Sequence, residues 1–296
     1  MLSAAQSLLL RPRLKDEDES GVVNRVTASE AGWQLLNIEV RRLKQGETWS
    51  QETGGCETAL VVLGGRCSVI SNRGEWPSVG RRVHAFDGMP YALYLPRKTS
   101  FELTAQTDRL EFAYCWAPAE EDHPPCLITP SDCEMEIRGG YNATRQINHI
   151  IPPGFDCQRI VCVEVYTPSG NWSSYPPHKH DDHREDEAGN LLEVDLEEVY
   201  FYKVDKPQGY AIQRVYTADR SIDAVLTCQE NDIVLVPEGY HPVVAAYGYN
   251  CYYLNFMAGS AQSLASSDEP AHAWTRETWT EPDPRLPLVH LGMEAP

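Results

Sequence analysis

The sequence predicts an all-β protein made of two tandem β domains, and three observations support this. Short runs rich in Val, Ile, Tyr and Thr recur between Gly, Pro and Asp residues, as in strands joined by turns. No amphipathic helix longer than two or three turns is evident, and 21 prolines fit a loop-rich β protein. The apolar runs of the two halves also match in kind, which indicates an internal repeat.

The predicted strands form two series along the chain. They cover residues 60–70, 91–96 and 111–118 in the first half, and residues 159–168, 198–204, 210–217, 232–237 and 249–259 in the second half. Glu57 and Glu198 are 141 residues apart, and so are Pro96 and Pro237. We therefore expect one barrel at residues 1–140, a second at 141–260, and an extended C-terminal arm at 261–296.

Composition narrows the possible partners. The 296 residues include 43 acidic and 25 basic side chains, which gives a formal charge of −18. Such a surface repels nucleic acid and anionic lipid, so we expect neither as a partner. Because no apolar window reaches the length of a membrane span or of a signal-peptide core, we expect a cytoplasmic protein. The nine cysteines include no C-x-x-C pair, which favours buried thiols over disulfides or a zinc ribbon.

The stretch YPPHKHD, residues 175–181, contains two histidines one residue apart. In a strand, His178 and His180 would point to one face and Lys179 to the other. Two imidazoles on one face are suited to binding a metal ion. For an isolated H-x-H pattern, a solvated surface loop is the alternative interpretation.

Two later segments favour the metal site. In LEEVYFYKV, alternation places Glu198, Tyr200 and Tyr202 on one face of a strand. DIVLVPEGYH then brings His241 just past another strand and a Pro-x-Gly turn. Three histidines and one carboxylate can hold a divalent first-row metal with positions left open for a substrate.

This order of residues resembles the cupin family, whose motifs read G-x5-H-x-H-x3–4-E-x6-G and G-x5-P-x-G-x2-H-x3-N. The resemblance implies two cupin barrels (double-stranded β-helix or jelly-roll folds) and the metal ligands His178, His180, Glu198 and His241. The chain departs from the pattern because 17 residues, 181–197, separate His180 from Glu198. We expect this acidic insert to form a loop at the barrel rim. No H-x-H precedes Glu57, so the first barrel is expected to lack a metal.

Longer strings carry a closer resemblance. SSYPPHKHDD, LEEVYFYKVDKPQGYAIQRVYT, VPEGYHPVVAAYGYNCYYLN and RGGYNATRQINHIIP are similar to the bicupin isomerases of inositol catabolism. This implies a metal-dependent aldose–ketose isomerase that converts 5-deoxy-D-glucuronate to 5-dehydro-2-deoxy-D-gluconate. Zinc or manganese would serve, because the reaction has no net redox change. By analogy with the fold, a homo-oligomer is also compatible with the sequence.

The resemblance leaves the roles of individual residues open. Glu198 or a metal-bound water is the candidate for proton transfer. Tyr200, Tyr202 and Tyr240 are candidates for contacting the substrate, with packing as the alternative. The substrate carboxylate needs a cation, and Arg145 and Arg214 are candidates because a guanidinium can bind it through two parallel hydrogen bonds. Lys179 is a third candidate, and for all three a structural salt bridge is the alternative.

Two other enzyme functions and one binding function compete with this interpretation. Another sugar-acid isomerase of the cupin class would use the same ligands. An iron-dependent cupin dioxygenase shares the site of three histidines and one glutamate but requires oxygen. A sugar-acid binding or regulatory module without turnover is the third alternative. The lack of an evident DNA-binding helix pair or basic face in the sequence weakens it.

Overall fold

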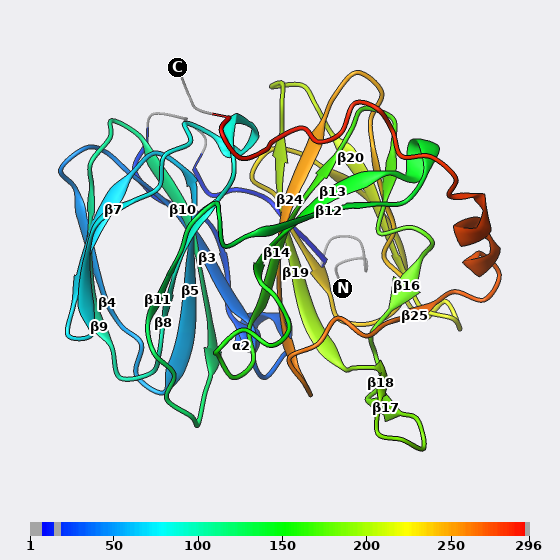
Figure 1. The fold of residues 1–296 in the computed structure, drawn as a ribbon, viewed down its shortest axis with the longest axis horizontal. Coiled ribbons are helices and arrows are strands. Elements are labelled where there is room, and N and C mark those ends of the chain that lie inside the picture. The colour runs from blue at the N-terminus through cyan, green and yellow to red at the C-terminus, as the bar shows by residue number, and fades with distance from the viewer. Residues whose placement is uncertain (1–7, 15–18, 294–296) are drawn as a thin grey trace. The chain divides into compact units, whose positions relative to one another are not determined.

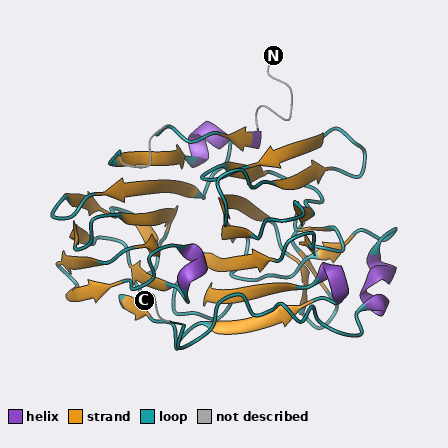
Figure 2. Ribbon diagram, turned by 90° about the horizontal axis from the view of Figure 1, so that it is seen from above, coloured by secondary structure: helices purple, strands orange, loops and turns teal. Residues whose placement is uncertain are grey.

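A computed structural model describes residues 8–14 and 19–293 of the chain. Strands make up nearly all of its regular structure (Figure 1, Figure 2), so the predicted all-β class is confirmed. The helical elements are short: α2 (Ala28–Ala31), η1 (Ala85–Asp87), η2 (Tyr141–Ala143) and η3 (Ala273–Thr278). None of the helices in the described part of the chain has the length and apolar character needed to span a membrane.

The chain divides into two compact units, each assembled from several segments. The first barrel comprises, among the described residues, 12–14, 19–134, 150–161 and 289–293. The second barrel comprises, among the described residues, 8–11, 135–149 and 162–288. In each unit a large sheet accompanies a four-stranded sheet.

The first barrel contains a six-stranded sheet in the order β11-β8-β5-β10-β3-β2 and a four-stranded sheet in the order β4-β9-β6-β7. Its strands are β2 (Gly21–Val26), β3 (Asn37–Leu43), β4 (Thr48–Glu52), β5 (Cys56–Gly64), β6 (Cys67–Ser71), β7 (Gly74–Val79), β8 (Tyr91–Leu95), β9 (Ser100–Ala105), β10 (Leu110–Pro118) and β11 (Cys126–Ile128).

The second barrel contains a seven-stranded sheet in the order β1-β22-β19-β24-β14-β13-β12 and a four-stranded sheet in the order β15-β23-β20-β21. Two two-stranded sheets, β16 with β25 and β17 with β18, complete it. Its strands are β1 (Leu9–Leu10), β12 (Glu134–Arg138), β13 (Arg145–Ile151), β14 (Val161–Thr167), β15 (Trp172–Ser173), β16 (His178–Lys179), β17 (Arg184–Glu185), β18 (Leu191–Glu193), β19 (Leu196–Val204), β20 (Ala211–Tyr216), β21 (Asp223–Cys228), β22 (Ile233–Val236), β23 (Val243–Ala245), β24 (Cys251–Gly259) and β25 (Ser267–Asp268).

The large sheets of the two barrels have corresponding centres. Strand β5 lies between β8 and β10, and strand β19 lies between β22 and β24. Both central strands have nine residues, and both are buried over most of their length. Glu57 and Glu198 each lie near the start of one of these strands. The same topological position therefore carries a carboxylate in both barrels.

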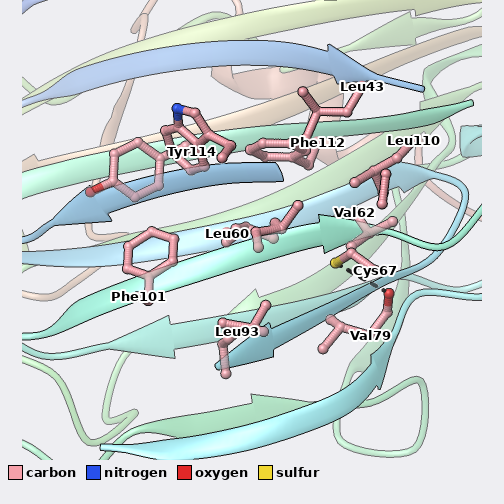
Figure 3. Close-up of a cluster of buried hydrophobic side chains, with 14 of the residues drawn as sticks. Leu43, Leu60, Val62, Cys67, Val79, Leu93, Phe101, Leu110, Phe112 and Tyr114 are labelled. Carbon is pink, nitrogen blue, oxygen red and sulfur yellow. Dashed lines mark hydrogen bonds between the residues drawn. The ribbon is translucent and has the colours of Figure 1, made fainter. Parts of the chain in front are cut away.

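The interior of the first barrel is filled with apolar side chains (Figure 3). Inward-facing residues alternate along the strands, as Leu60 and Val62 do in β5. The Trp49 ring packs against the rings of Phe101, Phe112 and Tyr114 at centroid distances of 5.7, 5.3 and 5.0 Å. These aromatic contacts fill part of the interior of the first barrel.

All nine cysteines of the chain are free, and seven of them are buried. Cys67 is an example from the core of the first barrel, and its thiol donates to the carbonyl of Val79. Burial raises the pKa of Cys67 to about 12, so the thiol stays protonated at neutral pH. The thiols are free as expected, although Cys56 and Cys126 are only half-buried.

Glu57 is fully buried and serves as an acceptor for four donors. Its Oε1 accepts from the backbone N–H of Arg159 at 2.6 Å and of Ile160 at 2.9 Å. Its Oε2 accepts from the N–H of Gln158 at 2.8 Å and from the Tyr94 hydroxyl at 3.0 Å. The carboxylate thus holds residues 158–160 against the start of β5.

We expect Glu57→Gln to destabilise the first barrel by roughly 2–4 kcal/mol, because the amide loses the negative charge and turns a donor toward N–H groups. The midpoint of urea unfolding measures this change. Glu52→Gln is the matched control, since Glu52 is exposed on β4 of the same barrel. Equal stabilities of the two variants would contradict the assigned role of Glu57.

Candidate metal centre

Three ligand-type side chains converge inside the second barrel. Candidate ligand atoms of His180, Glu198 and His241 all lie within 4.8 Å of one another, and all three residues are buried. Oε2 of Glu198 lies 2.9 Å from Nε2 of His180 and 3.3 Å from Nε2 of His241. The structure therefore brings together three of the four residues that the sequence indicated as metal ligands.

The fourth residue, His178, lies beside this group. Its ring centroid is 4.8 Å from that of His241, in an edge-on arrangement, and its side chain lines the same cavity. Strand β16 holds it by pairing with β25, which places His178 opposite Asp268. The two histidines of the H-x-H pattern thus both reach the cavity.

A glycine turn delivers His241 to the site. Gly239 has φ +90°, and a Cβ added there would lie 2.4 Å from the carbonyl oxygen of Tyr216. Only glycine avoids both the backbone strain and this clash. Paired backbone hydrogen bonds between Tyr216 and Tyr240 then hold the turn against β20. The Pro-x-Gly pattern in the sequence therefore has a local structural reason.

Backbone carbonyls orient all three imidazoles. Nδ1 of His180 lies 3.1 Å from the carbonyl oxygen of Leu196, and Nδ1 of His241 lies 2.8 Å from that of Gly239. Nδ1 of His178 lies 3.4 Å from the carbonyl oxygen of Pro176. Because a carbonyl only accepts, each Nδ1 carries a proton. In a ring that is neutral, Nε2 then keeps its lone pair for a ligand.

The electrostatic setting favours neutral rings at two positions. Burial lowers the pKa of His178 and of His241 to about 3. For His180, burial also acts to lower the pKa, but the hydrogen bond and charge of Glu198 outweigh it and the pKa is raised. Two imidazoles are therefore uncharged at neutral pH and can act as metal ligands without losing a proton first.

Glu198 has a fixed orientation. Nδ2 of Asn255 donates to its Oε1 at 2.8 Å, which leaves Oε2 facing His180 and His241. Strand pairing explains this contact. Strands β19 and β24 place Asn255 opposite Tyr200, which is two residues after Glu198 and on the same face of β19. The sequence analysis did not identify Asn255, because the signal is a cross-strand register that a single sequence does not reveal.

The cavity beside this group is lined by alternate residues of consecutive strands in the large sheet. The strand residues lining it are Leu196, Glu198 and Tyr200 of β19, Tyr253, Asn255 and Met257 of β24, Val163 and Val165 of β14, Arg145, Ile147 and His149 of β13, and Arg138 of β12. Ser174, His178, His180, Leu264, Ser266 and Arg276 complete the lining.

Two of the proposed substrate contacts lie in this cavity. Tyr200 and Arg145 both line it. Arg145 is buried, and its Nη1 donates to the carbonyl oxygen of Tyr175 at 3.1 Å. The Tyr200 hydroxyl lies 3.2 Å from the hydroxyl of Ser174.

The other four candidates are not among the described residues that line the cavity. Lys179 lies 3.1 Å from Glu193, and Arg214 forms a double hydrogen bond with Asp223. The Tyr202 hydroxyl donates to Gln213, and Tyr240 packs against Tyr216. Each of these side chains has a structural partner, which was the alternative considered for them.

The C-terminal arm adds residues that the sequence analysis did not identify as part of the site. In the structure, Leu264, Ser266 and Arg276 from this arm line the cavity. The sequence of the arm contains no recognisable motif around these three residues. Their contribution to the cavity was therefore not predictable from the sequence.

The acidic insert forms a hairpin that projects from the second barrel (Figure 1). Glu193, at the end of β18, is fully buried and accepts from the backbone N–H of Asp181 at 2.9 Å and from Arg184 at 2.6 Å. Burial alone would raise the pKa of Glu193, but hydrogen bonds from Ser267, Arg184 and the Asp181 backbone lower it to about 2. This carboxylate ties the base of the insert to the chain that follows His180.

Comparison with known proteins identifies relatives along most of the chain. The family model described as KduI/IolB family matches residues 8–275. A protein of Geobacillus thermodenitrificans named 5-deoxy-glucuronate isomerase is 43% identical over 263 residues, covering 88% of this chain and 93% of the relative. A protein of Bacillus subtilis with the same name is 38% identical over 276 residues, covering 92% of this chain and 99% of the relative.

Solved structures confirm the predicted fold of tandem cupin barrels. An IolB-like protein from Salmonella typhimurium LT2 superimposes with a TM-score of 0.85 at 37% identity, covering 90% of this chain and 98% of that one. Bacillus subtilis oxalate decarboxylase OxdC gives a TM-score of 0.60 at 14% identity, covering 88% and 79% of the respective chains. The second likeness concerns the fold alone.

We expect Glu193→Gln to remove a pH-dependent part of the stability. The folded-state pKa of Glu193 lies below its ordinary value of 4.5, so the ionised form contributes stability above that pH. This contribution is lost as the pH falls from about 4.5 toward about 2, and it amounts to roughly 2–3 kcal/mol.

Urea unfolding measured between about pH 6 and pH 3 tests this expectation. The free energy of unfolding should change less steeply with pH in Glu193→Gln than in the wild type. Glu187→Gln is the matched control, because Glu187 is exposed in the turn of the same insert. Identical slopes for the wild type and Glu193→Gln would refute the role of Glu193.

Proposed function

This chain belongs to the KduI/IolB family, whose curated relatives are named as isomerases, and from this membership we propose its reaction. The chain converts 5-deoxy-D-glucuronate to 5-dehydro-2-deoxy-D-gluconate, an aldose-to-ketose conversion, and it uses a divalent metal ion. The observation that carries the metal requirement is the buried group formed by His180, Glu198 and His241, with His178 beside it.

The residues present fit a divalent cation. Nε2 of His241 is buried and makes no hydrogen bond within the described part of the chain. An unpaired polar atom in such a place costs free energy, and a metal ion would satisfy it. Three imidazole nitrogens and one carboxylate oxygen also match the ligands preferred by zinc and manganese.

His178, His180, Glu198 and His241 would hold the ion in the proposed site. When bound, a divalent metal polarises the aldehyde of the substrate and makes the adjacent C–H more acidic. The backbone carbonyls that accept from Nδ1 keep the rings facing the site, and Asn255 keeps the Glu198 carboxylate in place.

A chain of hydroxyl groups would bind the hydroxyls of the sugar. The Ser174 hydroxyl lies 3.2 Å from that of Tyr200 and 3.3 Å from that of Tyr253. Burial raises the pKa of Tyr200 well above its ordinary value and the pKa of Tyr253 to about 12. Both phenols therefore stay protonated at neutral pH, which makes them hydrogen-bond donors and acceptors rather than bases.

The chain's own candidate for moving the proton is Glu198. Its Oε1 is engaged by Asn255, while Oε2 faces the histidines and the cavity. Because Oε2 would also bind the metal, Glu198 could act as the base only while this oxygen is released from the ion. It would then take the proton from one carbon and return it to the neighbouring carbon, while the hydroxyl proton moves to the former aldehyde oxygen, so that the atoms of the substrate are conserved. Apolar side chains such as Val163, Val165 and Met257 line the same cavity and limit access of water.

The proposed reaction is tested by incubating the metal-loaded protein with 5-deoxy-D-glucuronate in deuterated water and following the carbon and proton spectra by NMR. We expect the aldehyde signal to be replaced by that of the ketone. Deuterium in the new CH₂OH group would report exchange of the transferred proton with solvent.

Two further samples separate the competing functions. Removal of the metal by a chelator should abolish conversion, and added zinc should restore it under anaerobic conditions, which would exclude the dioxygenase. If the metal-loaded protein leaves 5-deoxy-D-glucuronate unchanged, the proposed reaction is wrong.

A further inference from the structure

Three guanidinium groups gather in the cavity that is lined by His178, His180 and Glu198. Arg138 comes from β12, Arg145 from β13 and Arg276 from η3 of the C-terminal arm. Such a gathering is notable in a chain with a formal charge of −18, because the rest of the surface disfavours anions. The three residues form what we call the arginine cluster.

Acidic side chains offset two of these charges. Glu136 accepts two hydrogen bonds from Arg138, each at 2.7 Å. Asp268 accepts two from Arg276, and this pair lies at the surface of the arm. The side chains of Arg138 and Arg276 are 39% and 45% exposed, so water also solvates them. Neither charge requires a ligand for its stability.

Arg145 differs from its two neighbours. It is 4% exposed, and within the described residues it forms no ion pair. Its guanidinium donates to the carbonyl oxygens of Ala143 and Tyr175 at 3.4 and 3.1 Å. A buried cation without a counter-ion is costly, and an anion entering the cavity would remove that cost. Burial and the nearby charges of Arg138 and Arg276 lower the pKa of Arg145 to about 10, which leaves it charged at neutral pH.

The arm fixes the geometry of the cluster through Trp279. Its indole ring lies 5.8 Å from the guanidinium carbon of Arg145 and 5.0 Å from that of Arg276. Cation–π contacts of this kind hold both guanidinium groups against one aromatic ring. A Cβ at Gly140 would lie 2.5 Å from Cα of Trp279, so the glycine of RGGYNATR admits the arm to this position.

We propose that the arginine cluster is a carboxylate-binding subsite, in which Arg145 provides the principal charge and the C-terminal arm completes the subsite with Arg276. The enzyme therefore selects sugar acids over neutral sugars of the same length. This inference rests on the proposed function, because it assigns a place to the carboxylate of that substrate. Among the three candidate cations from the sequence, only Arg145 lies in the cavity.

Binding of two non-reacting probes to the metal-loaded protein tests the subsite. D-gluconate carries a carboxylate, and D-glucitol is its neutral counterpart; neither has an aldehyde to isomerise. Isothermal titration calorimetry should show that the wild type prefers D-gluconate. The Arg145→Gln variant should bind D-gluconate roughly tenfold to a hundredfold more weakly than the wild type, as expected for loss of a charged hydrogen-bond donor. Its affinity for D-glucitol should equal that of the wild type.

Arg276→Gln provides a second variant in case Arg145→Gln does not fold, since Arg276 is half-exposed. It should reduce the same preference by a smaller factor. Arg220→Gln is the matched control, because Arg220 packs on Tyr216 and is not part of the cavity lining. Metal content, measured for every variant, should equal that of the wild type. A gluconate preference that survives in both Arg145→Gln and Arg276→Gln would overturn the inference.

The outcomes distinguish the subsite from the reaction. If the wild type isomerises 5-deoxy-D-glucuronate while Arg145→Gln keeps its preference for D-gluconate, the subsite is wrong and the function stands. If the wild type does not isomerise that substrate but Arg145→Gln loses the preference, the function is wrong and the subsite stands.

Discussion

The buried carboxylate of Glu198 is the group on which the second barrel's site depends. Asn255 donates to only one oxygen of the Glu198 carboxylate. Two of the three nearby imidazoles are uncharged at neutral pH. A carboxylate removed from water requires a cation or several donors to offset its lost solvation. In this barrel the position is suited to a divalent metal, and the strands around it form a cavity rather than a packed core.

The first barrel meets the same requirement in a different way. Glu57, near the start of the corresponding central strand, is satisfied by three backbone N–H groups and the Tyr94 hydroxyl. With no histidines to orient, the interior closes around Trp49 and other apolar side chains. The same strand position thus serves structure in the first barrel and is available for a ligand in the second, because different donors surround it.

The sequence predicted those features that depend on local patterns. Alternation along β19 indicated that Glu198 and Tyr200 share a face, and the Pro-x-Gly turn indicated where His241 follows its strand. Contacts set by cross-strand register or by distant segments were not predictable in this way. Asn255 meets Glu198 through the pairing of β24 with β19, and Arg276 reaches the cavity through an arm without a recognisable motif. Lys179 and Arg214 were plausible by residue type, but acidic neighbours engage both.

The most direct test of the central claim is a crystal structure of the zinc- or manganese-loaded protein, with anomalous differences recorded at the absorption edge of the metal. We expect one strong peak in the second barrel, bonded to Nε2 of His178, His180 and His241 and to Oε2 of Glu198, at roughly 2.0–2.2 Å for zinc. The first barrel should contain none. A peak bonded elsewhere, or a fully loaded protein without a peak among these four residues, would contradict the account.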